Sequence, residues 1–470
     1  MNTSFNVVIN PYNQNKLSAH IEIVNNSPVR YRYMVQGKTS DTHFIYSTNE
    51  YILNPVIPVI GLYAHYENKI EIVLTTIDRV EETLNITIST LNQDYGDTSL
   101  KLIINIYDTD AANITLGQGW FITSKWNGYD INGDLRITGL YPWLYGNLKI
   151  IDNALFSANS AEVYDPDKHA FAPKLYKINL LGKIIQTFTA PEGFGFHHDI
   201  TLDNEGHLFI LGTIMDNWSD AKKLESILYK YNVVSGELLW ERDYSTEFMG
   251  STVLDNTDIN DVHFNSLEYV KQTNHIIVNS RSTCTIMGLD PNSGDMQWII
   301  DNPAYPTLND EINLKALYPE SFKYTNGEHT VFLTSNTKYK NFSGEGQFVL
   351  SLFNNNSCAD EQGEELVRLI ESEPVSYTAA NLDSLPTIFA VNLNDRTVQK
   401  LDEFEFPGQR SELTSSVFDI NDHFSVYFGA EQTFFVFDNE NKVVLDIAEI
   451  DTDLGYRGRI MSYEQLRTLI

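Results

Sequence analysis

The chain has 470 residues, with 32 basic and 63 acidic side chains and a formal net charge of −31. This excess of carboxylates argues against nucleic acid or an anionic membrane surface as a partner, because binding phosphates needs clustered Lys and Arg. Hydrophobic residues make up 42% and aromatic residues 12% of the chain, which is enough apolar surface for large cores. The composition therefore indicates a globular protein, in which an anionic substrate must be met by a local positive group.

The sequence contains no apolar run close to the roughly 20 residues of a membrane span. Its first residues, MNTSFNVVINPYN, show no basic stretch followed by an apolar one. A cytosolic protein and a chain without its leader both stay open. The two cysteines, Cys284 and Cys358, lie far apart and have no metal-type spacing, so buried free thiols are favoured over a disulfide.

Residues 1–95 are expected to form an N-terminal β-sandwich of the immunoglobulin type. Short runs rich in β-branched and aromatic residues follow one another there without a longer repeat: FNVVIN, SAHIEIVN, YRYMVQG, KIEIVLTTI and TLNITIST. Helical periodicity is nearly absent from the whole chain, which makes this an all-β protein. Only EELVRLIES and the terminal SYEQLRTLI are expected to be helical.

Residues 110–470 are expected to form a six-bladed β-propeller, because two kinds of hairpin alternate there. The outer kind carries a turn cluster between two β-rich arms: KLYKINLLGKIIQTFTA, ILYKYNVVSGELLWERD, TIMGLDPNSGDMQWIID, TIFAVNLNDRTVQKLDE and FFVFDNENKVVLDIAEI. The inner kind begins at a polar residue: HHDITLDNEGHLFILG, HFNSLEYVKQTNHIIVNS, ESFKYTNGEHTVFLTS and TSSVFDINDHFSVYFG. A partial blade, SKWNGYDINGDLRITGL, brings the total to about six. The uneven spacing leaves five or seven blades open.

Radial repetition brings equivalent ends of the inner strands to one mouth of a central channel. The residues that begin these strands, His198, His263, Glu320 and Thr414, should therefore converge. The channel mouth is the predicted site.

One hairpin carries the most informative grouping. His263 and Asn265 are two apart on a strand and share a face, and the turn brings Arg281 within about one position of His263. A guanidinium, an imidazole and an amide at one rim suit a planar or tetrahedral oxyanion. Spacing leaves a structural alternative open, in which Arg281 pairs with a carboxylate and His263 is a hydrogen-bonded histidine at a strand end.

The adjacent pair His197 and His198 is expected to place its side chains on opposite faces, so that only one points inward. Such a pair cannot reach one ion, and no acidic or thiol partner stands at ligand spacing. We therefore expect no metal.

Three segments resemble the bacterial arylsulfate sulfotransferase family: NPYNQNKLSAHIEI, NPVIPVIGLYAHYENKIEIVL and DVHFNSLEYVKQTNHIIVNSR. The resemblance runs over nearly the whole chain and is diffuse outside these motifs. It implies transfer of a sulfuryl group from a phenolic sulfate ester to a phenol, through a histidine and without a nucleotide donor or other cofactor. It also implies periplasmic location and a homodimer for members that carry leaders.

Carried over by motif, the resemblance gives His263, Asn265 and Arg281 as sulfate-binding residues and His198 as a second active-site histidine. Thr414 falls at a polar position of the last inner strand. Two further residues come from the remaining blade.

In that blade the family has a glutamine-histidine-threonine pattern that carries the nucleophile, and YPESFKY stands at the matching place, which puts Glu320 in the catalytic position. His329, in NGEHTVFLTS, lies on the return strand and would reach the site only with a shifted register. We count His329 among the substrate-binding candidates.

Glu320 keeps three functions open. The first is an arylsulfate sulfotransferase that works through His198, His263, Arg281 and Glu320, with Glu320 as general base for direct transfer or another histidine as nucleophile. The second is a catalytically altered or inactive propeller that binds an anionic ligand or a protein partner. The third is a lyase or hydrolase with Glu320 as base.

Overall fold

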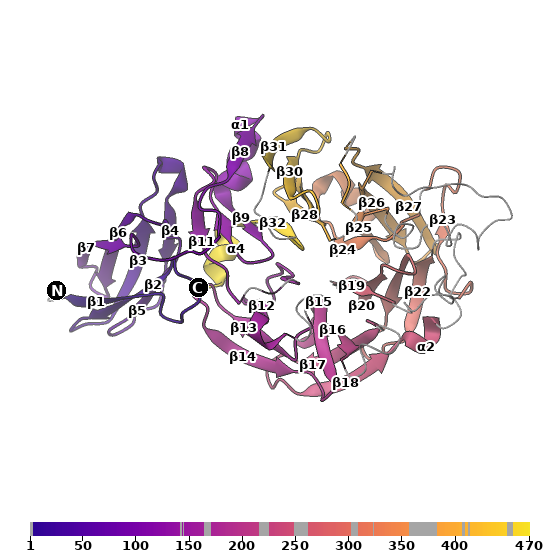
Figure 1. Ribbon diagram of the computed structural model, residues 1–470, viewed down its shortest axis with the longest axis horizontal. Coiled ribbons are helices and arrows are strands. Elements are labelled where there is room, and N and C mark those ends of the chain that lie inside the picture. The colour runs from indigo at the N-terminus through magenta and orange to yellow at the C-terminus, as the bar shows by residue number, and fades with distance from the viewer. Residues whose placement is uncertain are drawn as a thin grey trace.

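The structure is a computed structural model, and it describes residues 3–141, 143, 145–163, 171–215, 225–248, 262–301, 309–322, 324–356, 383–406, 409–411, 414–448 and 455–470. Figure 1 shows a ring of sheets around a common axis, with a separate pair of sheets beside it at the N-terminal end. No helix in these ranges is both long and apolar enough to cross a membrane.

The N-terminal part is a sandwich of two antiparallel sheets. The first has the order β1-β2-β5 and contains β1 (Ser4–Ile9), β2 (Ala19–Val24) and β5 (Val56–Val59). The second has the order β4-β3-β6-β7 and contains β3 (Val29–Val35), β4 (Phe44–Ser47), β6 (Glu67–Thr76) and β7 (Glu81–Ser89). In β3 every second residue is buried, which is the alternation that turns one face of a strand to a shared core.

The rest of the described chain forms six radial sheets, each numbered outward from its innermost strand. The first two contain β32 (Gly458–Ser462), β9 (Gly119–Thr123), β10 (Gly128–Tyr129) and β11 (Leu135–Ile137), then β12 (Leu155–Ser157), β13 (Lys174–Ile178) and β14 (Ile184–Thr189). The next two contain β15 (Phe194–Leu202), β16 (His207–Ile214), β17 (Ile227–Asn232) and β18 (Leu238–Asp243), then β19 (Phe264–Val270), β20 (His275–Ser280), β21 (Thr285–Leu289) and β22 (Met296–Asp301). The last two contain β24 (His329–Leu333), β25 (Gln347–Asn354), β26 (Leu385–Asn392), β27 (Thr397–Glu403) and β23 (Lys315–Ala316), then β28 (Ser416–Ile420), β29 (His423–Phe428), β30 (Thr433–Phe437), β31 (Val443–Ala448) and β8 (Ile103–Ile106).

Helices are short and lie between strands or at the chain end. They are α1 (Thr109–Ile114), α2 (Ser245–Phe248), α4 (Tyr463–Thr468) and the 3-10 turns η1 (Ser40–Thr42), η2 (Leu116–Gln118), η3 (Ser160–Glu162) and η4 (Thr337–Phe342). The side chain of Ser462 accepts a hydrogen bond from the backbone N–H of Gln465, which caps the start of α4.

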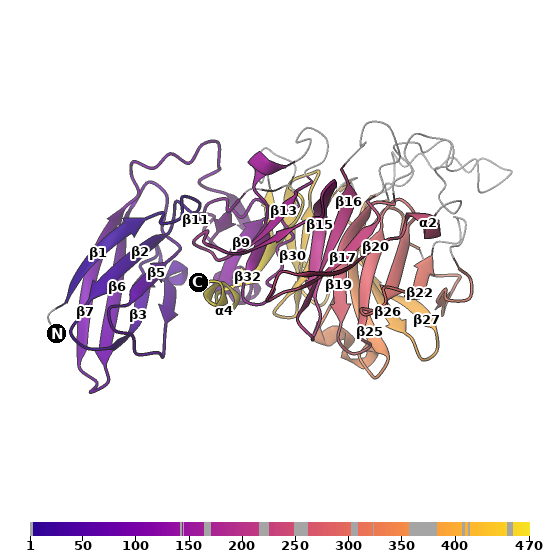
Figure 2. The ribbon, with the colours of Figure 1, turned by 90° about the horizontal axis from the view of Figure 1, so that it is seen from below.

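The ring is closed by pairing of strands that are far apart in the sequence. The late strand β32 pairs antiparallel with the early strand β9, with Ile460 opposite Phe121. The early strand β8 in turn completes the sheet of β28 to β31. Figure 2 shows the sandwich next to this closure, close to β9, β11 and α4. Closure removes exposed sheet edges and fixes the innermost strands around one channel.

A buried arginine links the sandwich to the ring. Arg136, on β11, donates to the carbonyl oxygens of Gly61 (2.8 Å) and Thr42 (2.9 Å) in the sandwich. It also forms a fully buried ion pair with Asp130 at 2.9 Å. A buried charge with this many partners ties the two parts together.

The all-β class, the immunoglobulin-like sandwich and the propeller agree with the sequence-based predictions. All five outer hairpins form, as do the inner hairpins that begin near His198, His263 and Thr414. The terminal helix is α4, Cys284 is a buried free thiol, and EELVRLIES and Cys358 lie outside the described residues.

The fourth inner hairpin was predicted wrongly. The innermost strand of that sheet, β24, begins at His329 and pairs with β25, and Glu320 is an exposed residue of a turn. The backbone N–H of Phe322 donates to Tyr318 O at 3.0 Å, and the Phe322 ring packs 4.9 Å from Phe389. The hydrophobic pattern of ESFKY therefore serves a turn that is folded onto the blade.

Candidate active site

Histidines from three neighbouring innermost strands meet at one mouth of the channel. The rings of His198 and His263 are 4.9 Å apart, and those of His263 and His329 are 6.4 Å apart. Tyr456, just before β32, lies 5.5 Å from His198 and 6.3 Å from His329. The ring of Tyr145 stacks on His198 at 4.0 Å. The cluster thus combines imidazoles with two phenol rings.

Backbone geometry turns these side chains into the channel. His198, His263, Thr330 and Thr414 all have positive φ, at 48°, 52°, 52° and 64°. Each of the three strands β15, β19 and β24 also has a register irregularity at this level. A left-handed conformation costs a non-glycine residue roughly 1 kcal/mol or more, and such strain tends to gather at functional sites.

The same geometry overturns one expectation. His197 and His198 do not point to opposite faces, because the positive φ of His198 interrupts the strand alternation, and their Nδ1 atoms are 2.7 Å apart. With Glu225 they offer potential ligand atoms within 4.8 Å of one another. Two ligands of one tetrahedral zinc are separated by roughly 3.3 Å, so the histidine contact is a hydrogen bond, and we assign no metal to it.

His329 is held in one tautomer by Asn355. The Asn355 Nδ2 donates to the carbonyl oxygens of Ser411 (2.6 Å) and Thr414 (3.1 Å), which fixes the orientation of the amide. Its Oδ1 therefore faces His329 Nδ1, 2.8 Å away, and can only accept. The hydrogen of neutral His329 is thus on Nδ1, and the lone pair is on Nε2.

The pKa of His329 is held well below its ordinary value of 6.5, chiefly by burial and then by the nearby charges of Arg281 and His263. Burial likewise lowers the pKa of His198 well below 6.5, helped by the histidines around it. Both rings are therefore neutral at neutral pH. Neutral His329 has the basic nitrogen that a nucleophile needs.

His263 has a different partner. Its Nδ1 lies 2.9 Å from Oε2 of Glu225, a fully buried carboxylate that comes just before β17. The carboxylate fixes the ring and favours its protonated form, as expected of a residue that shuttles protons.

Arg281 is next to His263, as predicted, since its backbone N–H donates to His263 O at 3.1 Å. Asn265 is fully buried, and its Nδ2 donates to Glu328 O at 2.8 Å, while its Oδ1 accepts from Asn279 at 2.6 Å. Asn265 thus holds the residue before His329, and Thr414 reaches His329 through Asn355. Of the predicted site residues, only Glu320 is away from this network.

A buried charged layer supports the cluster from below. Asp199 receives Arg457 through two contacts, NH1 to Oδ1 at 3.1 Å and NH2 to Oδ2 at 3.2 Å. Lys149 Nζ lies 3.1 Å from the same Oδ2. Arg457 also donates to Asn265 O at 3.1 Å, as does the Tyr456 hydroxyl. These contacts lock the strands that carry His198, His263 and Tyr456 against one another.

Sequence reasoning missed several of these residues: Glu225, Asn355, Tyr145, Tyr456 and Arg457. Glu225, Asn355 and Tyr145 stand outside the inner hairpins, so the repeat gave no signal for them. One available signal was overlooked for His329. The run Glu328-His329-Thr330 keeps the histidine-threonine part of the family pattern, with glutamate in place of glutamine.

The comparisons with known proteins agree with this geometry. The model of the family described as arylsulfotransferase (ASST) matches residues 80–458. The chain belongs to the arylsulfotransferase family. The model of the family's Ig-like domain matches residues 6–90, which contain the strands of the sandwich. A search of curated proteins found no match.

Among solved structures the likeness is distant. A periplasmic gluconolactonase from Pseudomonas aeruginosa has 10% identity and a TM-score of 0.36, with 92% of this chain and 99% of that chain covered. A protein of unknown function from Bacteroides caccae has 9% identity and a TM-score of 0.35, covering 93% and 99%. A virginiamycin B lyase from Staphylococcus aureus has 10% identity and a TM-score of 0.31, covering 96% and 90%. These values carry no argument about function.

Proposed function

We propose that this arylsulfotransferase-family protein transfers a sulfuryl group from an aryl sulfate to a phenol, with His329 as the nucleophile. The observation that carries the proposal is the contact between His329 Nδ1 and Asn355 Oδ1, which leaves the Nε2 lone pair for attack. His329 takes the place that the sequence had given to Glu320.

In the first step Nε2 of His329 attacks the sulfur, and the bond from sulfur to the phenolic oxygen breaks. The phenolate takes a proton from a neighbouring imidazolium, a role that suits His263 because its Nδ1 faces Glu225. Formation of the N–S bond makes the His329 ring cationic, and Asn355 Oδ1 stabilises the Nδ1 proton of that ring. Arg281 supplies positive charge for the sulfuryl oxygens.

In the second step an acceptor phenol gives its proton to His263, and its oxygen attacks the sulfur. The N–S bond breaks, the aryl sulfate product leaves and neutral His329 is restored. The two steps are balanced without a nucleotide, a metal or an oxidant. Tyr145 and Tyr456 border the histidines and offer ring faces for the aryl groups of donor and acceptor.

The case for an inactive propeller weakens with this assignment, because it was based on a missing histidine at position 320. The proposed lyase or hydrolase needs Glu320 as base, and Glu320 is exposed and lies in a turn outside the histidine cluster. Phenolic sulfate donors and phenol acceptors remain the favoured substrates.

The test is release of nitrophenol from p-nitrophenyl sulfate, with and without a phenol acceptor. We expect turnover that depends on the acceptor, ping-pong kinetics, and loss of at least a thousandfold in kcat/KM for His329→Gln. Rapid quench followed by mass spectrometry should find one sulfuryl group on the peptide that contains His329.

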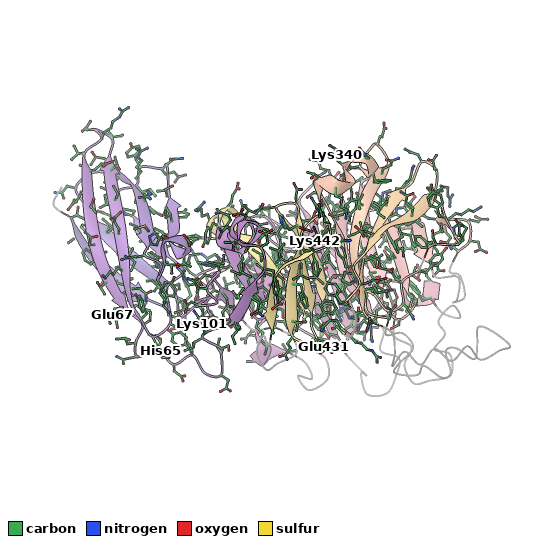
Figure 3. The ribbon with its side chains drawn as sticks, turned by 90° about the horizontal axis from the view of Figure 1, so that it is seen from above. His65, Glu67, Lys101, Lys340, Glu431 and Lys442 are labelled. Atoms are coloured by element: carbon green, nitrogen blue, oxygen red, sulfur yellow. The ribbon has the colours of Figure 1, made fainter. Side chains whose placement is uncertain are left out.

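The matched control is His65→Asn, at an exposed histidine of the sandwich far from the channel, where asparagine suits the positive φ of 48°. Figure 3 shows His65 on the sandwich side of the molecule. Unchanged activity in His329→Gln, or a sulfuryl group on another histidine, would falsify the assignment.

A further inference from the structure

A second cavity lies at the opposite mouth of the channel. Its volume is about 540 Å³, and its lining includes residues three to five positions further along the innermost strands than the histidine level. Glu268 on β19, Phe332 on β24 and Arg459 on β32 are examples. At roughly 3.3 Å per strand residue, this places the cavity about 10 Å or more from the histidines. The Asp199–Arg457–Lys149 layer lies between the two.

The carboxylates of this cavity already have donors. Asp419 accepts from Thr334 Oγ1 at 2.7 Å and from the backbone N–H of Ser335 at 2.6 Å. Glu268 lies 3.7 Å from Lys149 Nζ. Asp152 pairs with Lys177. The acidic side chains therefore have little capacity left for a cationic ligand.

The donors are in surplus. Lys149 is used up by Asp199 and by the carbonyl oxygens of Ile200 and Leu267. Arg459, by contrast, has one hydrogen bond, from NH1 to Leu148 O at 3.2 Å, and its buried Nε has none. Within the described ranges no carboxylate comes within ion-pair distance of Arg459.

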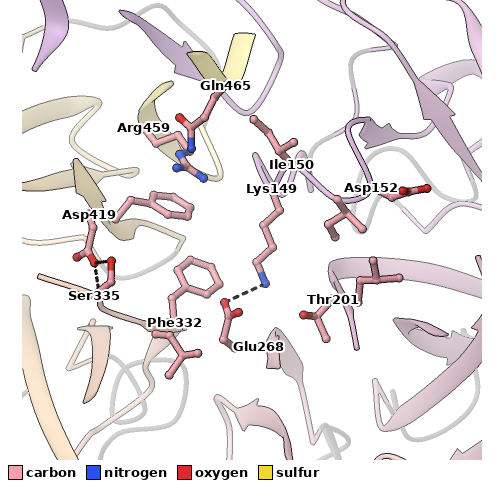
Figure 4. A pocket seen from close by; sticks show the side chains of 14 residues that line it. Lys149, Ile150, Asp152, Thr201, Glu268, Phe332, Ser335, Asp419, Arg459 and Gln465 are labelled. Carbon is pink, nitrogen blue, oxygen red and sulfur yellow. Dashed lines mark hydrogen bonds and ion pairs between the residues drawn. The ribbon is translucent and has the colours of Figure 1, made fainter. Parts of the chain in front are cut away.

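Gln465 adds a second donor beside this guanidinium. Its Oε1 accepts from the backbone N–H of Ser462 at 2.9 Å, which points the Nε2 hydrogens away from that contact. Figure 4 shows Arg459 and Gln465 side by side at the cavity and Lys149 joined to Glu268 across from them. A guanidinium and an amide NH2 together match the two oxygens of a planar oxyanion.

The other walls are apolar. The rings of Phe332 and Phe418 stack at 4.9 Å, and the guanidinium of Arg459 lies 4.5 Å above Phe418. Ile150, Ile151 and Leu202 complete the lining. A cavity of this size and mixed character suits an organic ligand more than a bare ion, since small-molecule sites combine apolar walls with a few convergent polar groups.

We propose that this cavity is a second ligand site, which binds a small organic oxyanion, a carboxylate or sulfate on an apolar body, through Arg459 and Gln465. The site is separate from the proposed sulfuryl-transfer site and does not depend on that function. Burial lowers the pKa of Arg459 to about 10, which is the expected effect of an enclosed cation that lacks a counter-charge.

The experiment is titration calorimetry of the full chain with benzoate, which carries no sulfuryl group to transfer. We expect saturable binding, at least tenfold weaker for Arg459→Gln than for wild type and unchanged for Arg281→Gln at the histidine mouth. Arg396→Gln, at an exposed arginine of the β26–β27 turn, is the matched control and should bind as wild type does. Acetate should bind at least several-fold more weakly than benzoate, because it lacks the apolar body.

Leu333→Trp provides a second route if Arg459→Gln does not fold. Leu333 lines the cavity, so tryptophan should fill it and abolish benzoate binding with Arg459 intact. Failure of wild type to bind benzoate, inorganic sulfate or phenyl sulfate would overturn the proposal. Equal affinity for wild type and Arg459→Gln, or loss in Arg281→Gln alone, would do the same. None of these results bears on whether His329 carries the sulfuryl group.

Discussion

Replacing Glu328 with glutamine is expected to stabilise the protein in a pH-dependent way. Glu328 is fully buried, and burial raises the pKa of its carboxyl from 4.5 to about 8, against smaller opposing effects from hydrogen bonds to its own backbone and to Thr325. At neutral pH the group is therefore mostly a neutral acid in the folded protein. A neutral glutamic acid has nearly the same shape as glutamine, the residue that the family pattern has here.

The magnitude follows from proton linkage. Because the folded-state pKa exceeds the unfolded-state pKa, the contribution of Glu328 to stability is greatest below pH 4.5 and is lost as pH rises toward 8. Each pH unit in this window lowers the free energy of unfolding by about 1.4 kcal/mol, which gives a loss of about 3 kcal/mol at pH 7. Glu328→Gln removes this loss, because glutamine does not titrate.

The assay is urea unfolding of both proteins at pH 4, 7 and 9, followed by near-ultraviolet circular dichroism. We expect equal midpoints at pH 4 and a higher midpoint for Glu328→Gln at pH 7 and 9. Glu320→Gln is the control, since it removes a carboxylate that is already exposed to water and should change little at any pH. A Glu328→Gln protein that gains nothing between pH 4 and pH 9 would refute the reasoning.

Three further outcomes can be measured. Activity should persist below pH 6.5 and fall only as His329 takes up a proton at its lowered pKa, which a pH profile of kcat/KM would reveal. Asn355→Leu should lower kcat about ten- to a hundredfold, because the Nδ1 proton loses its acceptor, whereas Asn355→Asp should keep activity and move the acidic limb to higher pH. An Asn355→Asp enzyme with an unmoved limb would contradict the role of this contact. Arg136→Met should lower the free energy of unfolding by about 3–5 kcal/mol, since it leaves Asp130 buried without its partner, and unfolding measured beside an exposed-site control such as Arg396→Gln checks this.

The sequence predicted the parts of the fold that repeat. Alternating apolar residues and turn clusters predicted the sandwich and most hairpins, because strand period and turn chemistry are local properties. The pairing of His263 with Arg281 was also predictable, since a single tight hairpin joins them. These inferences needed no knowledge of distant contacts.

The failures came from irregular backbone and from contacts between blades. His198 was expected to point away from His197, and its positive φ broke the alternation on which that inference depended. Glu320 was placed on a strand because ESFKY has a β-like composition, whereas burial of Phe322 against another blade strand decided its structure. Asn355 is 26 residues from His329 in sequence, so only the folded sheet could show that it holds the imidazole.

The strand that closes the ring has a consequence for how the protein becomes active. Tyr456 and Arg457 precede β32 and Arg459 lies on it, so the histidine cluster and the opposite cavity both gain essential walls from the last strand in sequence to form. A nascent chain still attached to the ribosome can build the earlier sheets, but neither site is whole until β32 has docked beside β9. Chemical competence is thereby coupled to completion of the circle, and a chain truncated before residue 455 should be inert at both ends of the channel.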